Sequence, residues 1–276
     1  MSRVAAVDLG TNSTRLLVAD VTDGHVDEIV RRSVVTHLGE GVDAGRVLLP
    51  SAIGRVWNVL GTYRDEIEAL GAIRTLAVAT SAVRDSANGP DFLRDIEVEF
   101  GFATRLLTGA QEAELTRRGV GAVEPGTLLV DVGGGSTELI LGAFRTSLDV
   151  GSVRLTERHL RHDPPLPAEI AAAAHAVASL LPELDVASAI GVAGTVAQLH
   201  ALIGELTLPE LEAELALLAG LPLEQRRRVP GMDPARAPVI LGGTIVVIEV
   251  LRRYGLAEIG FSRRELLDGA ALDAAS

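Results

Sequence analysis

Two acids separated by a glycine-rich turn, Asp131 and Glu138, are the residues of this chain whose types and spacing best suit chemistry. Between them stand the turn Gly133–Gly135 and Ser136, and apolar runs flank the stretch on both sides. This order is typical of two strands joined by a tight turn. Glycine lets a ligand approach the backbone, and its N–H groups can point outward together as an anion-binding nest. Because two acids would repel a bare phosphate, a phosphate bound here implies a bridging Mg²⁺. A plain hairpin with a flexible turn fits this stretch equally well.

The start of the chain repeats the pattern. Asp8–Val18 reads D-L-G-T-N-S-T-R-L-L-V and aligns without gaps with Asp131–Leu141, D-V-G-G-G-S-T-E-L-I-L. The identical pairs are Asp8/Asp131, Gly10/Gly133, Ser13/Ser136, Thr14/Thr137 and Leu16/Leu139. This spacing indicates an internal repeat at the scale of whole domains. Two matching turns predict a two-sided phosphate clamp and argue against the plain hairpin.

The two copies differ at one informative position. Arg15 stands in the first copy where Glu138 stands in the second. The two turns therefore cannot be equivalent, and we expect the first to hold phosphate and the second to hold the metal as well.

Composition limits the classes of protein that the chain can belong to. Its 276 residues are 47% hydrophobic and 22% charged, which suits one large or two small globular domains. The net charge of −12 argues against nucleic acid and anionic membranes as partners. The chain has no cysteine, which excludes disulfides and thiolate chemistry, and no lysine, which excludes a P-loop lysine and Schiff-base chemistry. Arginine remains available to clamp phosphate.

No targeting or membrane segment is evident. The N-terminus already reads as a strand and lacks a signal-peptide pattern, and the longest apolar run, Val239–Ile248, is about half of a membrane span. We expect a cytoplasmic protein.

The elements around the two turns alternate between strand and helix. Each half begins with a three-strand meander and continues with helices and further strands, which predicts an α/β fold. We also expect a loop over Leu38–Leu48, a solvated helix face at the run Arg226–Arg228 and a strand over Leu256–Phe261. We expect one domain over residues 1–120 and a second over residues 121–276. The last helix, about residues 263–273, could pack back on the first domain.

Three further residues lie where ligands bind in such sheets. Arg84 follows the buried strand Thr75–Thr80, Glu112 lies in the first turn of a helix, and Thr195 follows the glycine turn Gly191–Gly194 that opens another helix. Each has a purely structural alternative. Arg84 could form a surface ion pair with Asp85, and Glu112 could be a solvated acid that the helix dipole favours. The glycines before Thr195 could serve only the packing of the strand against the helix. The histidines show no zinc spacing, and no G-x-S-x-G motif is present.

Taken together, these motifs closely resemble the exopolyphosphatase/guanosine pentaphosphate phosphohydrolase (Ppx/GppA) family. The matching stretches, in chain order, are Asp8–Leu16, Ala79–Asn88, Asp131–Leu139, Gly151–Arg158, Ala193–Leu199 and Met232–Ile240. The resemblance implies the fold of the actin/Hsp70/sugar-kinase superfamily, with two ribonuclease-H-like domains flanking a cleft. The chain resembles the short form, which lacks the C-terminal helical domain of longer members.

The resemblance also implies roles for individual residues. Glu112 matches the family's catalytic acid, which orients or deprotonates the attacking water. Asp131 and Glu138 match the acids that hold Mg²⁺ (or Mn²⁺). The residues that match phosphate contacts are Asn12, Ser13, Arg84, Gly133, Gly134, Gly135, Ser136 and Thr195. Positioning and charge neutralisation are the main requirements of phosphoryl transfer, so this set is sufficient in kind.

The implied activity is that of an exopolyphosphatase, which hydrolyses the terminal phosphate of inorganic polyphosphate. Two alternatives stay open: a pppGpp 5′-phosphohydrolase and a non-catalytic phosphate- or nucleotide-binding protein of the same fold. Gln111, Glu114 and Pro238 depart from the family's usual Glu, Arg and Asp, and these departures bear on substrate choice. Homodimers occur in the family, and we carry a homodimer over as an expectation.

Overall fold

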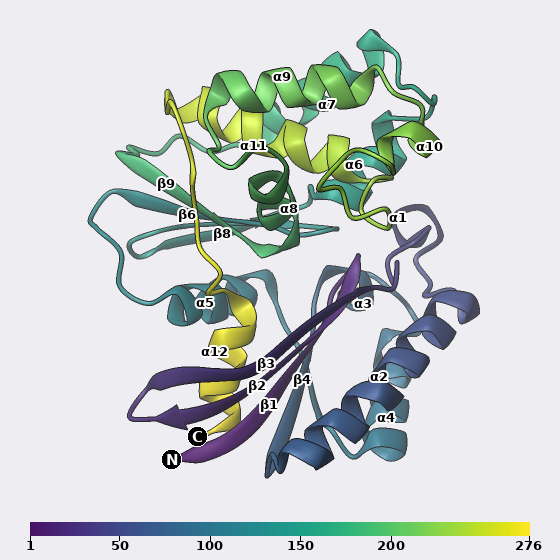
Figure 1. Cartoon of the computed structure of the whole chain (residues 1–276), viewed down its shortest axis with the longest axis vertical. Coiled ribbons are helices and arrows are strands. Elements are labelled where there is room, and N and C mark those ends of the chain that lie inside the picture. The colour runs from purple at the N-terminus through teal and green to yellow at the C-terminus, as the bar shows by residue number, and fades with distance from the viewer. The chain divides into compact units, whose positions relative to one another are not determined.

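The computed structural model describes all 276 residues. They form two compact units, which we call unit 1 (Met1–Gly121 with Arg264–Ser276) and unit 2 (Ala122–Arg263). Each unit contains one five-stranded sheet with helices packed against it (Figure 1). This arrangement confirms the predicted α/β fold class.

The sheet of unit 1 begins with an antiparallel meander and continues with two parallel strands. Its strand order is β3-β2-β1-β4-β5, with β1 in the centre. The strands are β1 (Ser2–Leu9), β2 (Ser13–Thr22), β3 (His25–Val35), β4 (Arg74–Ala79) and β5 (Ala103–Leu106). Because β1 is paired on both sides, the turn that follows Leu9 has a fixed starting point.

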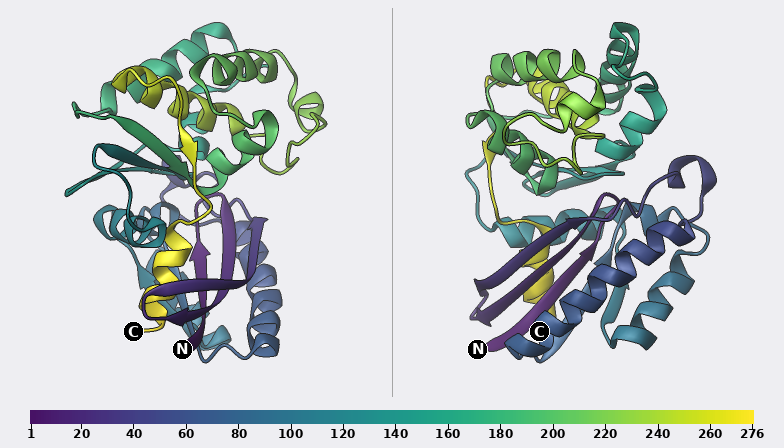
Figure 2. Two further views of the ribbon diagram at one scale, coloured as in Figure 1. Left: turned by 60° about the vertical axis from the view of Figure 1, so that its left-hand side comes forward. Right: turned by 45° about the vertical axis from the view of Figure 1, so that its right-hand side comes forward.

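Both faces of β1 are covered, as the alternation of its side chains requires. Ala5, Val7 and Leu9 face a core formed with helices α2 (Pro50–Leu70) and α4 (Gly89–Phe100). The intervening Val4 and Ala6 face a second core. That core is formed with the C-terminal helix α12 (Leu266–Ala274) and with α5 (Gly109–Val120). Figure 2 shows α2 and α4 on one side of the sheet and the yellow α12 on the other.

The sheet of unit 2 has the same order, β8-β7-β6-β9-β10, read from the meander to the parallel strands. Its strands are β6 (Thr127–Val132), β7 (Thr137–Leu141), β8 (Phe144–Leu148), β9 (Ser188–Val192) and β10 (Gly260–Phe261). Each strand therefore has a counterpart in unit 1, from β1/β6 to β5/β10. The matching order confirms the internal repeat.

One long apolar helix, α11 (Ile240–Tyr254), organises the core of unit 2. It packs against four other helices, and glycines at its N-terminal end allow close approach. A Cβ on Gly242 would lie 2.6 Å from the Ser152 carbonyl oxygen, and one on Gly243 would lie 2.3 Å from the Thr195 methyl carbon. The four partners are α6 (Ser152–His159), α7 (Pro167–Leu180), α8 (Ala193–Ile203) and α9 (Leu208–Ala219). Helix α11 thereby fixes where α6 and α8 begin.

Short segments differ from what the sequence predicts. The strand expected over Leu256–Phe261 is reduced to β10, because the Leu256 N–H still bonds the Leu251 carbonyl at the end of α11. The loop expected over Leu38–Leu48 contains the single turn α1 (Val42–Gly45). None of the helices combines the length and apolar character needed to cross a membrane.

The structure also corrects the predicted exposure of Arg226, the first of three consecutive arginines. The run suggested a solvated helix face, but Arg226, at the end of α10 (Leu223–Arg226), is only 4% exposed. Its guanidinium donates to the carbonyls of Leu218, Leu221 and Ala237. Arg226 therefore connects the end of α9 to two loops within unit 2.

Glycines also bring α5 and α12 into backbone contact. A Cβ on Gly119 would lie 1.9 Å from the carbonyl oxygen of Glu265, and one on Gly269 would lie 2.0 Å from that of Leu115. Because the obstructing atoms belong to backbone, no side-chain rotation can relieve the clash. Helix α5 is consequently held in place by α12.

We predict that Gly119→Ala destabilises the protein by about 1–3 kcal/mol or more, because the added methyl forces the two helices apart. Gly54→Ala in α2 is the matched control. No atom lies within 4 Å of its added Cβ, so alanine should stabilise the helix by about 0.4–1 kcal/mol. Urea denaturation followed by circular dichroism measures both changes. A Gly119→Ala variant as stable as wild type would contradict the described contact.

Candidate functional site

The acid–glycine turn of unit 2 joins β6 to β7 at the end of the central strand. Asp131 and Glu138 are direct cross-strand partners, and both are buried, at 5% and 0% exposure. The turn between them is closed by a hydrogen bond from the Gly133 N–H to the Ser136 carbonyl, 3.0 Å long. Two carboxylates predicted to act together therefore lie side by side.

Helix α6 holds this turn from behind. The N–H of Ser152 donates to the Gly133 carbonyl at 2.9 Å, and the N–H of Val153 donates to the Gly134 carbonyl at 2.8 Å. A Cβ on Gly151 would lie 2.6 Å from the Gly134 carbonyl oxygen, so only glycine permits this approach. With their carbonyls bonded to α6, Gly133 and Gly134 have a defined orientation.

Thr195 lies at the same edge of the sheet. Val192 at the end of β9 is the cross-strand neighbour of Asp131, and α8 begins at the next residue. Ala193 adopts a positive φ of 67°, which turns the chain sharply from strand to helix. The Thr195 side chain is buried against Gly243. Unit 2 thus brings together Asp131, Glu138, Thr195 and the turn Gly133–Ser136.

The donor set of this edge suits a hard divalent cation that keeps much of its hydration shell. Asp131 and Glu138 supply two adjacent carboxylates, and no group of three or more potential metal-ligating side chains lies together. Mg²⁺ is commonly held by one or two carboxylates, with water and substrate phosphate completing its coordination. The hydroxyl of Ser147 donates to Glu138 Oε1 at 2.6 Å and so orients that carboxylate.

The equivalent turn of unit 1 has the same backbone and different charges. The Gly10 N–H donates to the Ser13 carbonyl at 3.1 Å, as in unit 2. The cross-strand partner of Asp8 is Arg15, whose Nη2 lies 2.7 Å from Asp8 Oδ2. Burial raises the pKa of the Asp8 carboxyl; Arg15 opposes this shift, and Glu265 adds to it.

Three buried polar atoms of this turn form no hydrogen bond: Asp8 Oδ1, Asn12 Oδ1 and Ser13 Oγ. Buried polar atoms are nearly always paired within a protein, and leaving one unpaired costs about 1–3 kcal/mol. The turn therefore presents atoms suited to a ligand: Ser13 Oγ can donate a hydrogen bond, whereas Asp8 Oδ1 and Asn12 Oδ1 only accept. The phosphate-contact roles of Asn12 and Ser13 stay predictions.

Arg84 and Glu112, two of the predicted site residues, meet in unit 1. Arg84, at the end of α3 (Ser81–Arg84), donates through Nη1 to the Leu107 carbonyl at 2.8 Å and lies 3.3 Å from Glu112 Oε2. The Thr11 hydroxyl accepts from the Ala82 N–H at 3.2 Å and ties α3 to the first turn. Arg84 is thus bound to Glu112, which differs from the suggested surface pair with Asp85.

Helix α5 gives Glu112 its position. Thr108 caps the helix, and the Gln111 side chain bonds back to the Thr108 N–H at 2.9 Å, which completes a capping box. Gln111, a departure from the family pattern, is therefore used in the cap. Glu112 is only 7% exposed, which differs from the solvated first-turn acid considered above.

Sequence reasoning did not predict the contacts of three charged residues next to these turns. Arg154 of α6 is 6% exposed, and its N–H donates to the Gly134 carbonyl. Arg15 binds Asp8, and Glu265 binds Arg15. Arg154 and Arg15 lie within recognised motifs and could have been assigned from them. Glu265 lies 250 residues from Arg15 in sequence, and no local pattern indicates it.

A duplicated five-stranded sheet whose central strand leads each time into an acid and a glycine turn defines the class: an α/β protein built from two units of the same topology. Within that class, the chain belongs to the Ppx/GppA phosphatase family, whose sequence pattern matches residues 17–275. The family resemblance inferred from the motifs is therefore confirmed.

Full-length relatives agree with this assignment. Exopolyphosphatase 2 of Mycobacterium tuberculosis (strain CDC 1551 / Oshkosh) is 37% identical over 316 aligned positions, which cover 100% of this chain and 99% of the relative. Among solved structures, an exopolyphosphatase-like protein is 30% identical with a TM-score of 0.92 and 98% coverage of both chains. The Aquifex aeolicus PPX-GPPA enzyme is 29% identical with a TM-score of 0.81 and 99% coverage of both.

Proposed function

We propose that this protein is an exopolyphosphatase, a phosphoric anhydride hydrolase that releases orthophosphate from the end of inorganic polyphosphate. The observation that carries the proposal is the full-length similarity to a protein named exopolyphosphatase 2. The buried acid of α5, paired with an arginine, and the duplicated acid–glycine turns support it as the chemical equipment of such an enzyme.

In this reaction a water molecule attacks the terminal phosphorus, and the bond between that phosphorus and the bridging oxygen breaks. We assign Glu112 to orient this water and to accept its proton, a role that requires only hydrogen-bond reach. Arg84 holds Glu112 Oε2 and presents a positive charge where the phosphate would bind. Orthophosphate and a chain shorter by one phosphate result.

The remaining predicted residues would bind the phosphates and the cation. Asp131 and Glu138 would hold Mg²⁺ or Mn²⁺, which when bound neutralises charge that develops on the phosphate oxygens. We assign phosphate binding to the backbone N–H groups of Gly133, Gly134 and Gly135 and to the side chains of Asn12, Ser13, Arg84, Ser136 and Thr195. With no lysine in the chain, arginine supplies all the permanently positive side chains.

We predict that Glu112→Gln lowers kcat on short polyphosphate by more than about a hundredfold, because an amide cannot accept the proton of the attacking water. Orthophosphate release with Mg²⁺ measures the rate. Glu99→Gln, the same change at an exposed position of α4, should retain wild-type activity. Equal activity of the Glu112→Gln variant and wild type would exclude the proposed role.

The choice of substrate is tested separately. We expect kcat/KM for inorganic polyphosphate to exceed that for the 5′ γ-phosphate of pppGpp when both are measured side by side. The reverse order would identify the chain as a pppGpp 5′-phosphohydrolase. Binding of either compound without turnover in a single-turnover assay would identify a non-catalytic binding protein.

We predict that Ser147→Ala raises the Mg²⁺ concentration for half-maximal activity by roughly tenfold, because Glu138 loses the hydrogen bond that orients it. Ser188→Ala is the matched control: Ser188 lies in the same sheet, and its hydroxyl bonds Thr127, not either acid. A Ser147→Ala variant with the Mg²⁺ dependence of wild type would contradict the proposed role of this hydrogen bond in orienting a metal-holding Glu138.

A further inference from the structure

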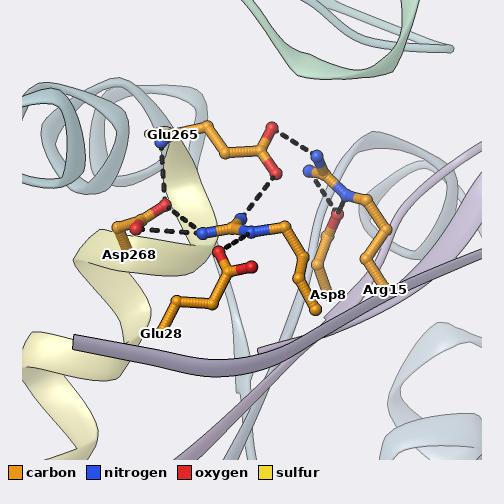
Figure 3. A network of polar contacts seen from close by, with 6 residues as sticks. Asp8, Arg15, Glu28, Glu265 and Asp268 are labelled. Atoms are coloured by element: carbon orange, nitrogen blue, oxygen red, sulfur yellow. Dashed lines mark hydrogen bonds and ion pairs between the residues drawn. The ribbon is translucent and has the colours of Figure 1, made fainter. Parts of the chain in front are cut away.

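A chain of ion pairs in unit 1, mostly buried but including the exposed Glu28, joins the first acid–glycine turn to the start of α12 (Figure 3). Arg15 lies between Asp8 and Glu265, and Arg31 lies between Glu265 and the acids behind it. The six members are Asp8, Arg15, Glu28, Arg31, Glu265 and Asp268. Four carboxylates thus share two guanidinium groups, so Asp8 and Glu265 both bind Arg15.

Two arginine–aspartate pairs bridge β1 and β2, and their geometries differ. Arg3 and Asp20 are cross-strand partners, and each carboxylate oxygen accepts one N–H, from Nε and from Nη2, both at 2.9 Å. Arg15 and Asp8 are also cross-strand partners, but Nε and Nη2 both approach the same oxygen, Asp8 Oδ2, at 2.8 and 2.7 Å. The two-oxygen arrangement of the first pair is the common one for arginine and carboxylate.

The partner of the remaining nitrogen distinguishes the pairs. Nη1 of Arg3 donates to a neutral acceptor, the Leu70 carbonyl. Nη1 of Arg15 donates to the carboxylate of Glu265, a charge-assisted and therefore stronger bond. Holding this end of the guanidinium turns Arg15 away from the two-oxygen geometry. Asp8 Oδ1 is consequently left buried and without a hydrogen bond.

Glu265 is itself firmly held. Its N–H donates to Asp268 Oδ2 at 3.0 Å, and its carbonyl packs against Gly119 of α5. Its second carboxylate oxygen lies 3.4 Å from Arg31, which Asp268 and Glu28 bind from the other side. The residue is 6% exposed. Its carboxylate therefore presents Arg15 with a fixed acceptor.

We propose that Glu265 is a positioning residue of the phosphate site: by holding Arg15 Nη1, it keeps Asp8 Oδ1 open to the ligand. This inference rests on the proposed function. An ionised carboxylate oxygen only accepts hydrogen bonds, so its partner must be a donor. On a polyphosphate ligand that donor is a water molecule, either the attacking water or one carried by a bound cation. Ser13 Oγ, also unbonded in the same turn, can donate a hydrogen bond and would contact the phosphate itself, whereas Asn12 Oδ1 only accepts and, like Asp8 Oδ1, suits a water molecule.

Glu265→Gln tests the proposal, because it removes the charge that attracts Arg15 and keeps the size of the side chain. Arg15 should then move onto both oxygens of Asp8, as Arg3 does on Asp20. We expect kcat on polyphosphate to fall roughly tenfold or more, since small displacements in a site cost rates of this order. If the water is carried by a cation, the Mg²⁺ concentration for half-maximal activity rises; if it is the attacking water, kcat falls at saturating Mg²⁺. Either result supports the proposal.

Asp273→Asn is the matched control. Asp273 lies on α12 and also bridges two arginines, Arg105 and Arg118, but touches neither Arg15 nor Asp8. The control should keep at least half of wild-type kcat, and its melting temperature should be no higher than that of Glu265→Gln. A loss of activity in Glu265→Gln is then not explained by lower stability. Equal losses of activity in the two variants, or unchanged kinetics in Glu265→Gln, would overturn the proposal. Should Glu265→Gln not fold, Glu265→Asp replaces it, because aspartate is a favoured N-cap residue for α12 and is one methylene too short to hold Arg15.

Crystal structures of wild type and Glu265→Gln separate this inference from the proposed function. If wild type releases no orthophosphate, the proposed function fails. The position of Arg15 relative to Asp8 in the two crystal structures then tests the positioning role of Glu265 by itself. An Arg15 N–H within hydrogen-bond distance of Asp8 Oδ1 in the variant supports the positioning role. An Arg15 unchanged from wild type overturns it.

Discussion

A buried carboxylate at the end of the central strand is the constraint on which each unit depends. Asp8 is the second-last residue of β1 and Asp131 is the second-last residue of β6, and both are almost fully buried. A buried charge is tolerated only with a partner or a ligand. In unit 1 the partner is Arg15, across the strand pair, which is held in turn by Glu265. In unit 2 the residue across the strand pair is a second acid, Glu138. The residue that faces the aspartate across the strand pair, Arg15 in unit 1 and Glu138 in unit 2, therefore gives the two copies different chemistry.

The turns keep their shape because helices approach them at glycines. Gly151 lets α6 bond the carbonyls of the second turn, and Gly243 lets α11 press on Thr195. In unit 1, Gly119 and Gly269 bring α5 and α12 into backbone contact. A methyl group at any of these positions would meet atoms closer than van der Waals contact allows. Glycines outside the two turns thus allow the helices around the site to pack closely.

The structure also suggests how the duplicated sheet serves phosphate chemistry. Both copies retain the same closing hydrogen bond, from Gly10 to Ser13 and from Gly133 to Ser136. Around this shared backbone, unit 1 adds Arg84 and Glu112, whereas unit 2 adds a second carboxylate oriented by Ser147. Identical backbone turns can therefore carry different side-chain roles within one chain.

The sequence by itself determined the repeat, the α/β class, the family and the identity of the acids, because these depend on local order: a strand, an acid, glycines and a second strand. It also predicted most helices, since caps and apolar spacing are local signals. Only the tertiary structure decided that Arg84 binds Glu112, that Arg226 is buried, and that Glu265 reaches Arg15 from 250 residues away. These contacts depend on how helices pack at glycines and on which buried charges must share partners. No local pattern in the chain encodes either, because both arise only when distant segments come together.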